Sequence, residues 1–283
     1  MYRSLQPGAV GIRATLEEGL ELAAQVGFEG LHVNIGEVIE IGPEKVKAQF
    51  EVKGLLPSAW GIPVDVRGED AAFERGLEIL PKWADAAQEL GCLRTSTYIL
   101  SFSDDLPFEE NYQRHRGRLR AIGEILCDRG IRLGLEFLGP KTLRDGHPYA
   151  FIHTMDGMLE LCQEIGTGNM GLLLDAWHWY TAHGTVEDLR RLRDEDVVDV
   201  HVNDAPRGIP VDEQVDNIRC LPGETGVIDM AGFLRALHEV GYTGPIMAEP
   251  FSKKLQGLPP QEAARLIGEA MKSIWRMAGL DIH

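Results

Sequence analysis

The chain has 283 residues, of which 44% are hydrophobic and 25% are charged, as in ordinary globular proteins. Its formal net charge of −16 argues against a nucleic-acid partner, because nucleic-acid binders usually present a basic face. Its apolar runs are shorter than the roughly 18 residues of a membrane span, and the first residues lack the apolar core of a signal peptide. The four cysteines show no C-x-x-C or zinc-finger spacing, so we expect a reduced, cytoplasmic protein without a membrane partner.

Eight short apolar runs are predicted to be strands that alternate with helices. In chain order these runs are Ala9–Ile12, Gly30–Asn34, Leu55–Trp60, Leu93–Ile99, Ile131–Phe137, Gly171–Asp175, Val197–Val202 and Pro245–Glu249. The stretches between them carry apolar residues at three- and four-residue steps, as one-sided helices do, and several end in glycine. A helix followed by a glycine and then by an apolar run is the order expected for a parallel sheet.

Eight strand–helix units in a chain of this length predict a (β/α)8 TIM barrel, formed as a single domain by residues 1–283. The alternative is an open doubly wound sheet, which would carry a glycine-rich phosphate loop after its first strand. The first predicted strand is followed by RATLEEG instead. The longest irregular stretches, Gly139–His153 and Asn203–Gly226, each follow a strand, where barrel enzymes build their substrate pockets.

Four polar residues stand at the ends of four successive predicted strands, namely Glu136, Asp175, His201 and Glu249. Neighbouring parallel strands lie about 5 Å apart and end at the same mouth of a barrel, so these side chains can converge on one ion. Inward-pointing carboxylates without a counter-charge are unfavourable, and mixed oxygen and nitrogen ligands suit Mn²⁺, Mg²⁺, Co²⁺ or Zn²⁺. Each residue alone has a structural explanation, such as helix capping, but the coincidence on four strands predicts a site for one divalent metal ion.

The two glutamates of this set are candidates for catalysis. Glu136 and Glu249 belong to the fifth and eighth predicted strands, so they can face each other across the mouth. With a cation between them, one carboxylate can remove a proton from a carbon beside a polarised carbonyl, and the other can return one. The cation would stabilise the enediolate that forms between these steps. Asp175 and His201 are then plain metal ligands.

Further residues are candidates for contacts with a substrate: His178, Arg207, Trp60, Trp177 and His32. His178 and Arg207 follow the ligands of their strands by three and six positions, so each can donate to a substrate oxygen. The two tryptophans are candidates for apolar walls against a sugar ring, and His32 for a polar contact. Helix capping, surface ion pairing and packing of the loops are the structural alternatives for these residues.

Over most of its length, and most strongly from Glu136 to Phe251, the chain resembles the xylose-isomerase-like TIM-barrel superfamily of sugar isomerases and epimerases. The resemblance rests on LEF, LLLDAWHW, VHVNDAPR and the closing segment LPGETGVIDMAGFLRALHEVGYTGPIMAEPF. It implies that the four ligands bind one divalent metal and that Glu136 and Glu249 are also the acid/base pair. It further implies that His178 and Arg207 contact substrate oxygens, as in the ketose 3-epimerase branch and in the keto-inositol isomerase branch, which is the nearer one.

The expected activity is a metal-dependent isomerisation or epimerisation of a keto-sugar or of an inosose-like keto-polyol. The same first step can instead lead to elimination, which would make the protein a lyase or dehydratase of a keto-sugar, an inosose or a dehydroshikimate-like substrate. An abasic-site endonuclease would need further His and Asp ligands, but the third predicted strand has no histidine and no D-x-H motif follows His201. A non-catalytic sugar-binding barrel is the remaining alternative. The sequence leaves open the substrate, the metal and whether copies of the chain associate as a homo-oligomer.

Overall fold

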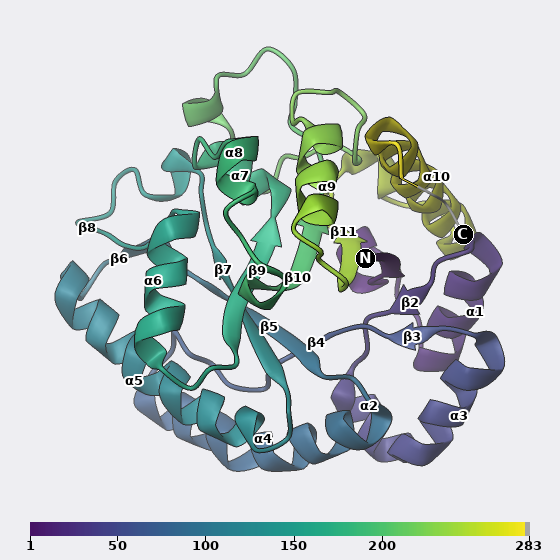
Figure 1. The fold of residues 1–283 in the computed structure, drawn as a ribbon, viewed down its shortest axis with the longest axis horizontal. Helices are drawn as coiled ribbons and strands as arrows, with labels where there is room; N and C mark the ends of the chain where they lie inside the picture. Colours follow the sequence, from purple (N-terminus) through teal and green to yellow (C-terminus); the bar gives the residue numbers. More distant parts are fainter. Residues whose placement is uncertain (281–283) are drawn as a thin grey trace.

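Parallel strands line the inside of the molecule and helices surround them, in a computed structural model that describes residues 1–280 (Figure 1). Nine strands form one sheet, and every pair within it is parallel. In spatial order they are β3 (Leu56–Pro57), β2 (Gly30–Leu31), β1 (Tyr2–Leu5), β11 (Pro245–Ala248), β10 (Val197–Val202), β9 (Met170–Asp175), β7 (Arg132–Phe137), β5 (Arg94–Ile99) and β4 (Trp60–Gly61).

The two strands at the ends of this order close the sheet into a barrel. β3 and β4 are two short pieces of the single predicted strand Leu55–Trp60, and β3 pairs with β2 while β4 pairs with β5. Between them, the Ser58 amide donates to the Leu31 carbonyl at 2.9 Å, and the Ala59 carbonyl accepts from the Val33 amide at 2.9 Å. The sheet therefore has eight strand positions, and the predicted TIM barrel is confirmed.

The first strand lies earlier in the chain than the sequence suggests. The prediction of a strand over Ala9–Ile12 is wrong, because Gly8–Val10 form a 3₁₀ helix and β1 is Tyr2–Leu5. This strand is half polar, so a search for apolar runs misses it. Its polar residues have specific partners, since Arg3 pairs with Glu29 at 3.0 Å and the Ser4 hydroxyl donates to that of Ser58 at 2.8 Å.

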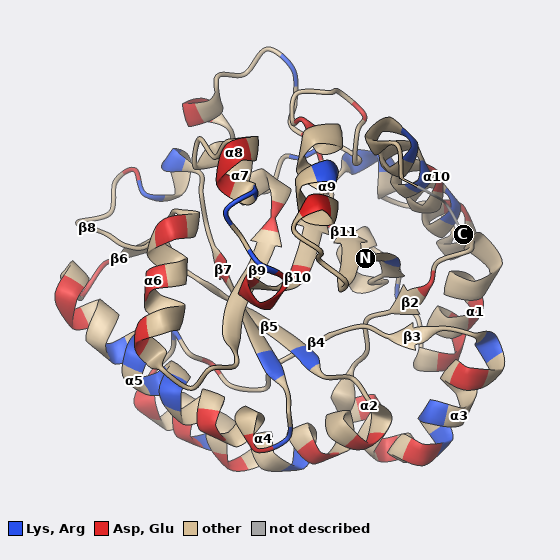
Figure 2. Ribbon diagram, in the orientation of Figure 1, with Lys and Arg blue, Asp and Glu red and all other residues tan. Residues whose placement is uncertain are grey.

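The helices form the outer layer of the barrel. They are α1 (Leu16–Val26), α2 (Ile35–Ile41), α3 (Pro43–Lys53), α4 (Asp70–Leu90), α5 (Phe108–Cys127), α6 (Met155–Ile165), α7 (Ala176–Thr181), α8 (Val186–Leu189), α9 (Met230–Glu239) and α10 (Pro260–Ala278). Figure 2 shows that most acidic and basic residues lie on these outer helices. Within residues 1–280, we find no helix long and apolar enough to cross a membrane.

A small antiparallel pair joins two loops beside the barrel. β6 (Phe102–Ser103) follows β5, β8 (Tyr149–Ala150) lies in the loop after β7, and the two strands pair through two residues each. The His147 ring stacks on Phe102 with the ring centroids 3.5 Å apart. The long loop after β7 is therefore held in place by the loop after β5.

Candidate metal centre

The ends of four neighbouring strands bring the four predicted ligands together. Glu136 lies in β7, Asp175 ends β9, His201 lies in β10, and Glu249 directly follows β11. These strands are adjacent in the sheet, and the register pairs His201 with Asp175. Each of the four residues offers one ligand atom, and these atoms all lie within 4.8 Å of one another. The strands of the barrel therefore form the cluster that the sequence predicts.

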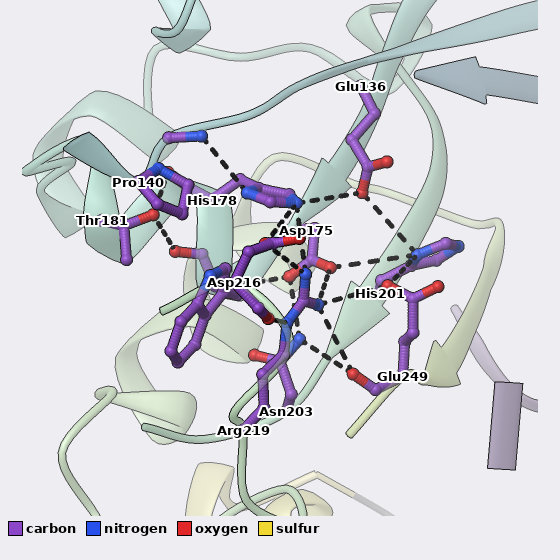
Figure 3. Close-up of polar contacts among 12 residues, drawn as sticks. Glu136, Pro140, Asp175, His178, Thr181, His201, Asn203, Asp216, Arg219 and Glu249 are labelled. Carbon is purple, nitrogen blue, oxygen red and sulfur yellow. Dashed lines mark hydrogen bonds and ion pairs between the residues drawn. The ribbon is translucent and has the colours of Figure 1, made fainter. Parts of the chain in front are cut away.

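The imidazole of His201 faces all three carboxylates of the cluster (Figure 3). Its Nδ1 lies 3.9 Å from Oε1 of Glu136, 4.0 Å from Oδ2 of Asp175 and 3.7 Å from Oε2 of Glu249. Glu136 and Glu249 approach it from opposite sides. These distances are too long for hydrogen bonds. They suit ligand atoms that share a divalent ion, since each would lie about 2.0–2.2 Å from it.

Two atoms of the cluster test whether a metal fits the site. Oε1 of Glu136 and Nδ1 of His201 are buried, and neither has a hydrogen-bond partner among residues 1–280. Buried polar atoms in proteins almost always have a partner, so these two atoms indicate a group that completes the site. Carboxylate oxygens together with an imidazole nitrogen are ligands for a divalent cation. The residues present therefore fit one divalent metal ion.

The electrostatics of the cluster indicate the same need for positive charge. Burial and the nearby charge of Glu249 raise the pKa of Glu136 well above its usual range. Burial by itself would lower the pKa of His201, but Glu249 and the other carboxylates raise it to about 10. Burial would likewise raise the pKa of Glu249, but His201 and Arg219 hold it below its usual range. When no metal ion is bound, the raised pKa values of Glu136 and His201 favour their protonated forms, which offset the negative charge of the carboxylates.

Arg219 is a functional residue that the sequence interpretation missed. Its guanidinium is buried, and Nη1 lies 2.9 Å from Oδ2 of Asp175 and 3.2 Å from Oε2 of Glu249. Nη2 donates to Oδ1 of Asp216 at 3.0 Å. Arg219 belongs to the long loop after β10. The only signal in the sequence that could have indicated it is the position of this loop, which follows a strand and therefore lies at the mouth of the barrel. The loop therefore brings a permanent positive charge to two of the ligands.

Arg207, the arginine that the sequence favoured, lies elsewhere. It is exposed, and its Nε donates to the carbonyl of Thr225 at 2.8 Å. The cause is the buried carboxylate of Asp204, which accepts the amides of Thr225, Gly226 and Ile228 at 2.7–3.0 Å. These bonds hold the returning part of the loop against the end of β10, and Arg207 lies over that contact. The structure does not bring Arg207 into the cluster.

His178 lies beside the cluster, and a backbone amide that faces its ring determines its tautomer. The amide of Gly139 donates to Nδ1 of His178 at 3.2 Å. A neutral imidazole that accepts at Nδ1 carries its proton on Nε2. That Nε2 lies 3.7 Å from Oε1 of Glu136 and 3.8 Å from Oδ1 of Asp216. Burial lowers the pKa of His178 to about 3, so the imidazole is neutral and presents an N–H donor to the site.

Gly139 holds this position because a larger residue does not fit there. A Cβ at Gly139 would lie 2.2 Å from the carbonyl oxygen of His178 and 2.5 Å from Oγ1 of Thr181. Nη2 of Arg219 lies 3.4 Å from Nε2 of His178, a contact that would suit the opposite tautomer. The amide of Gly139 determines which tautomer forms, because it is part of the main chain and faces Nδ1 of His178. Nη2 of Arg219 already donates to Asp216 and so does not need Nε2 of His178 as an acceptor.

The remaining three predicted substrate contacts are all buried. Trp60 is buried, its indole N–H donates to the carbonyl of Cys92 at 3.1 Å, and its ring lies 6.4 Å from that of Trp83, as expected for packing. Trp177 is buried, with the Arg219 guanidinium 5.3 Å from its ring centroid. His32 is buried too.

Phe251 is a second residue near the cluster that the sequence interpretation did not include among the site residues. Its ring centroid lies 4.7 Å from the guanidinium carbon of Arg219, and 42% of the residue is exposed. Its φ of 37° is unusual for a residue other than glycine. Such a backbone conformation is not visible in the order of residues. An exposed aromatic ring therefore lies beside the buried cation.

Comparison with known proteins identifies the family. Residues 20–274 match the family model of the xylose isomerase-like TIM barrel. The 3-dehydroshikimate dehydratase of Pseudomonas putida is 26% identical over 268 residues, which cover 93% of this chain and 40% of that protein. The inosose isomerase of Halalkalibacterium halodurans is 29% identical over 147 residues, which cover 52% of this chain and 49% of that protein. The chain thus spans less than half the length of these two relatives.

A solved structure agrees over the whole chain. A xylose isomerase domain protein from Alicyclobacillus acidocaldarius has 30% sequence identity and a TM-score of 0.87, and the match covers 99% of both chains. The family model covers most of the chain as well, and its fold is the barrel described above. The chain belongs to the xylose isomerase-like TIM-barrel family.

Proposed function

We propose that the protein is a divalent-metal-dependent isomerase or epimerase of a keto-sugar or an inosose-like keto-polyol, which moves a proton through an enediolate. One observation carries this proposal: the buried Glu136 and the partly buried Glu249 approach His201 from opposite sides (Figure 3). A substrate bound between two such carboxylates can lose a proton to one and receive a proton from the other.

Each residue of the site has a role in this reaction. Glu136, Asp175, His201 and Glu249 would hold the divalent ion. When bound, such an ion polarises a substrate carbonyl and offsets the negative charge that develops on it. One of the two glutamates removes the proton from the carbon beside the carbonyl, and the opposite glutamate returns one. In the reverse reaction the two glutamates exchange these roles.

Two residues from loops complete the site. His178 points its Nε2–H toward the space beside Glu136, where it can donate to a substrate oxygen on which negative charge develops. The guanidinium of Arg219 lies between Asp175 and Glu249, and together with His201 it holds the pKa of Glu249 below its usual range, which favours the ionised carboxylate. An ionised carboxylate is required both of a metal ligand and of a base, so Arg219 supports both functions.

The relatives support this class of reaction and also a second candidate. The inosose isomerase matches about half of this chain and supports an isomerase. The 3-dehydroshikimate dehydratase matches 93% of this chain, and this wider coverage favours a dehydratase as the alternative. Both reactions can begin with removal of a proton beside a carbonyl, so the same glutamates serve either one. They differ in whether the intermediate is reprotonated or expels a hydroxyl group.

The experiment that tests the proposal measures metal content and then proton exchange. The purified chain is loaded with Mn²⁺, Mg²⁺, Co²⁺ or Zn²⁺ and incubated in D₂O with inososes, ketoses and 3-dehydroshikimate. Deuterium beside the carbonyl together with an isomeric product supports the isomerase. Loss of water from the substrate supports the dehydratase instead. Stoichiometric metal without exchange or product on any of these ketones contradicts both.

A further inference from the structure

A second buried carboxylate lies beneath the ligand cluster. We propose that Asp199 is a positioning residue for His201: when Nδ1 of the imidazole holds the metal, the Asp199 carboxylate accepts a hydrogen bond from the Nε2–H and so orients the ring. This inference rests on the proposed function only in taking His201 as a metal ligand. Neither the resemblance nor the comparisons assign a role to Asp199.

The strand places Asp199 and His201 on the same side. The two residues are two positions apart in β10, and side chains at this spacing point to the same face of a strand. Asp199 is completely buried, and its Oδ1 accepts the Val200 amide at 2.9 Å. Its Oδ2 has no hydrogen-bond partner within residues 1–280 and lies 3.9 Å from Nε2 of His201, so a small shift of the ring or the carboxylate is needed to form a hydrogen bond. A free carboxylate oxygen therefore faces the back of the imidazole.

The chemistry of imidazole then assigns a role to this oxygen. The three carboxylates of the cluster all approach His201 at Nδ1, so Nδ1 is the atom that faces the ion. A nitrogen that binds a metal carries no proton, so the proton of the neutral imidazole lies on Nε2. A buried N–H needs an acceptor, and Oδ2 of Asp199 is the carboxylate oxygen on that side. Carboxylates in this position commonly orient metal-bound histidines.

His32 lies on the other side of the same carboxylate. Its Nε2 is 3.7 Å from Oδ2 of Asp199, and this nitrogen also has no hydrogen-bond partner among the residues described. His32 is buried and follows β2, so it reaches the carboxylate from another part of the barrel. Asp199 thus lies between two imidazoles, and an N–H of His32 would orient its carboxylate toward His201. The contact between His32 and the substrate stays a prediction from the sequence, and in this inference His32 supports Asp199.

The test replaces Asp199 in the full chain with its neutral isostere. We expect Asp199→Asn to weaken Zn²⁺ and Co²⁺ binding by about 10–100-fold, measured by competition with a chromophoric chelator, as for other partners of metal-bound histidines. The melting temperature of the metal-free protein separates this effect from a loss of fold. Asp196→Asn is the matched control, because it removes the same charge just before the same strand, where Asp196 pairs with Arg193. It should leave metal affinity unchanged.

A second measurement uses the unaltered protein, so that it does not depend on how the variant folds. Nitrogen-15 NMR of the Zn²⁺-loaded chain should show a protonated Nε2 and a metal-bound Nδ1 for His201. Metal bound at Nε2, or wild-type affinity in Asp199→Asn, overturns the inference. The absence of metal binding by the wild type overturns it together with the proposed function. Tight metal binding that falls in Asp199→Asn, but without turnover of any ketone, supports the inference while the proposed function fails.

Discussion

The strand ends and the loop after β10 contribute to the same site in different ways. Glu136, Asp175 and His201 stand on six-residue strands that are paired on both sides, so their backbone positions follow from the barrel itself. Arg219 comes from a loop whose path depends on a few polar contacts, chiefly those of Asp204. The strands thus define where the candidate ligands meet, and the loop adds a positive charge beside them.

Substitutions at the strand ends and in the loop should therefore affect activity and stability differently. Strand residues are held by many backbone hydrogen bonds, so a substitution there changes the chemistry and leaves the geometry intact. A loop residue such as Arg219 contributes through charge and through its own contacts, so its removal should change stability as well as function. A loop residue outside the cluster should change neither.

The largest effect is expected for Glu249, the glutamate that directly follows β11. Glu249→Gln keeps the shape of the side chain but removes its ability to take up a proton, so kcat should fall by about 10²–10⁴-fold or more. Circular dichroism should show an unchanged fold. Near-full turnover by this variant would refute the acid/base role of Glu249, and an unfolded protein would show that Glu249 is needed for structure.

The next effect concerns the loop cation. Arg219→Ala leaves the buried carboxylate of Asp175 and the partly buried carboxylate of Glu249 without this counter-charge, which should lower the free energy of unfolding by about 3–5 kcal/mol in the metal-free protein. Because a bound divalent cation supplies positive charge to the same carboxylates, Zn²⁺ should restore part of the lost stability. Urea denaturation with and without metal measures both values. Equal stability of the variant and the wild type would mean that Arg219 does not balance these charges.

The pH dependence of metal binding should follow from the protonation of His201. The pKa of His201 is raised to about 10 without an ion, so at neutral pH a proton occupies the nitrogen that the metal needs. Metal affinity should therefore rise with pH, by about tenfold per unit for each proton displaced. The stabilisation of metal-free protein by this proton is complete below the unfolded pKa of about 6.5 and is lost as pH rises toward 10. A pH-independent Zn²⁺ affinity between pH 6 and 9 would contradict this account.

The barrel and its four ligands could be predicted from the sequence because both follow from regular backbone patterns. Apolar runs that alternate with one-sided helices predict parallel strands, and the ends of such strands meet regardless of side-chain detail. The first strand was not predicted because Arg3 and Ser4 are polar, and their partners Glu29 and Ser58 are distant in the sequence. Burial of such residues depends on contacts that a linear pattern does not contain.

The loop residues could not be predicted for a related reason. Arg207 stands closer to His201 in the chain than Arg219 does, and sequence spacing favours the nearer residue. In the structure the more distant Arg219 reaches the cluster and Arg207 does not. The carboxylate of Asp204 binds three backbone amides of the returning loop, and Arg207 stays on the outside of that contact. Such a contact depends on one side chain within an irregular stretch. The tautomer of His178 likewise depends on the amide of Gly139, in another loop.

The smallest effect is expected for the arginine that sequence spacing favoured. Arg207 is exposed and bonds only to the carbonyl of Thr225 among the residues described, so Arg207→Ala should change the free energy of unfolding by no more than about 0.5 kcal/mol. Metal affinity and KM should also remain those of the wild type. A large rise in KM with unchanged metal content would instead show that Arg207 turns toward the substrate on binding. Because Arg207 and Arg219 share one loop and lose the same charge, comparing the two alanine variants isolates the contribution of the buried position.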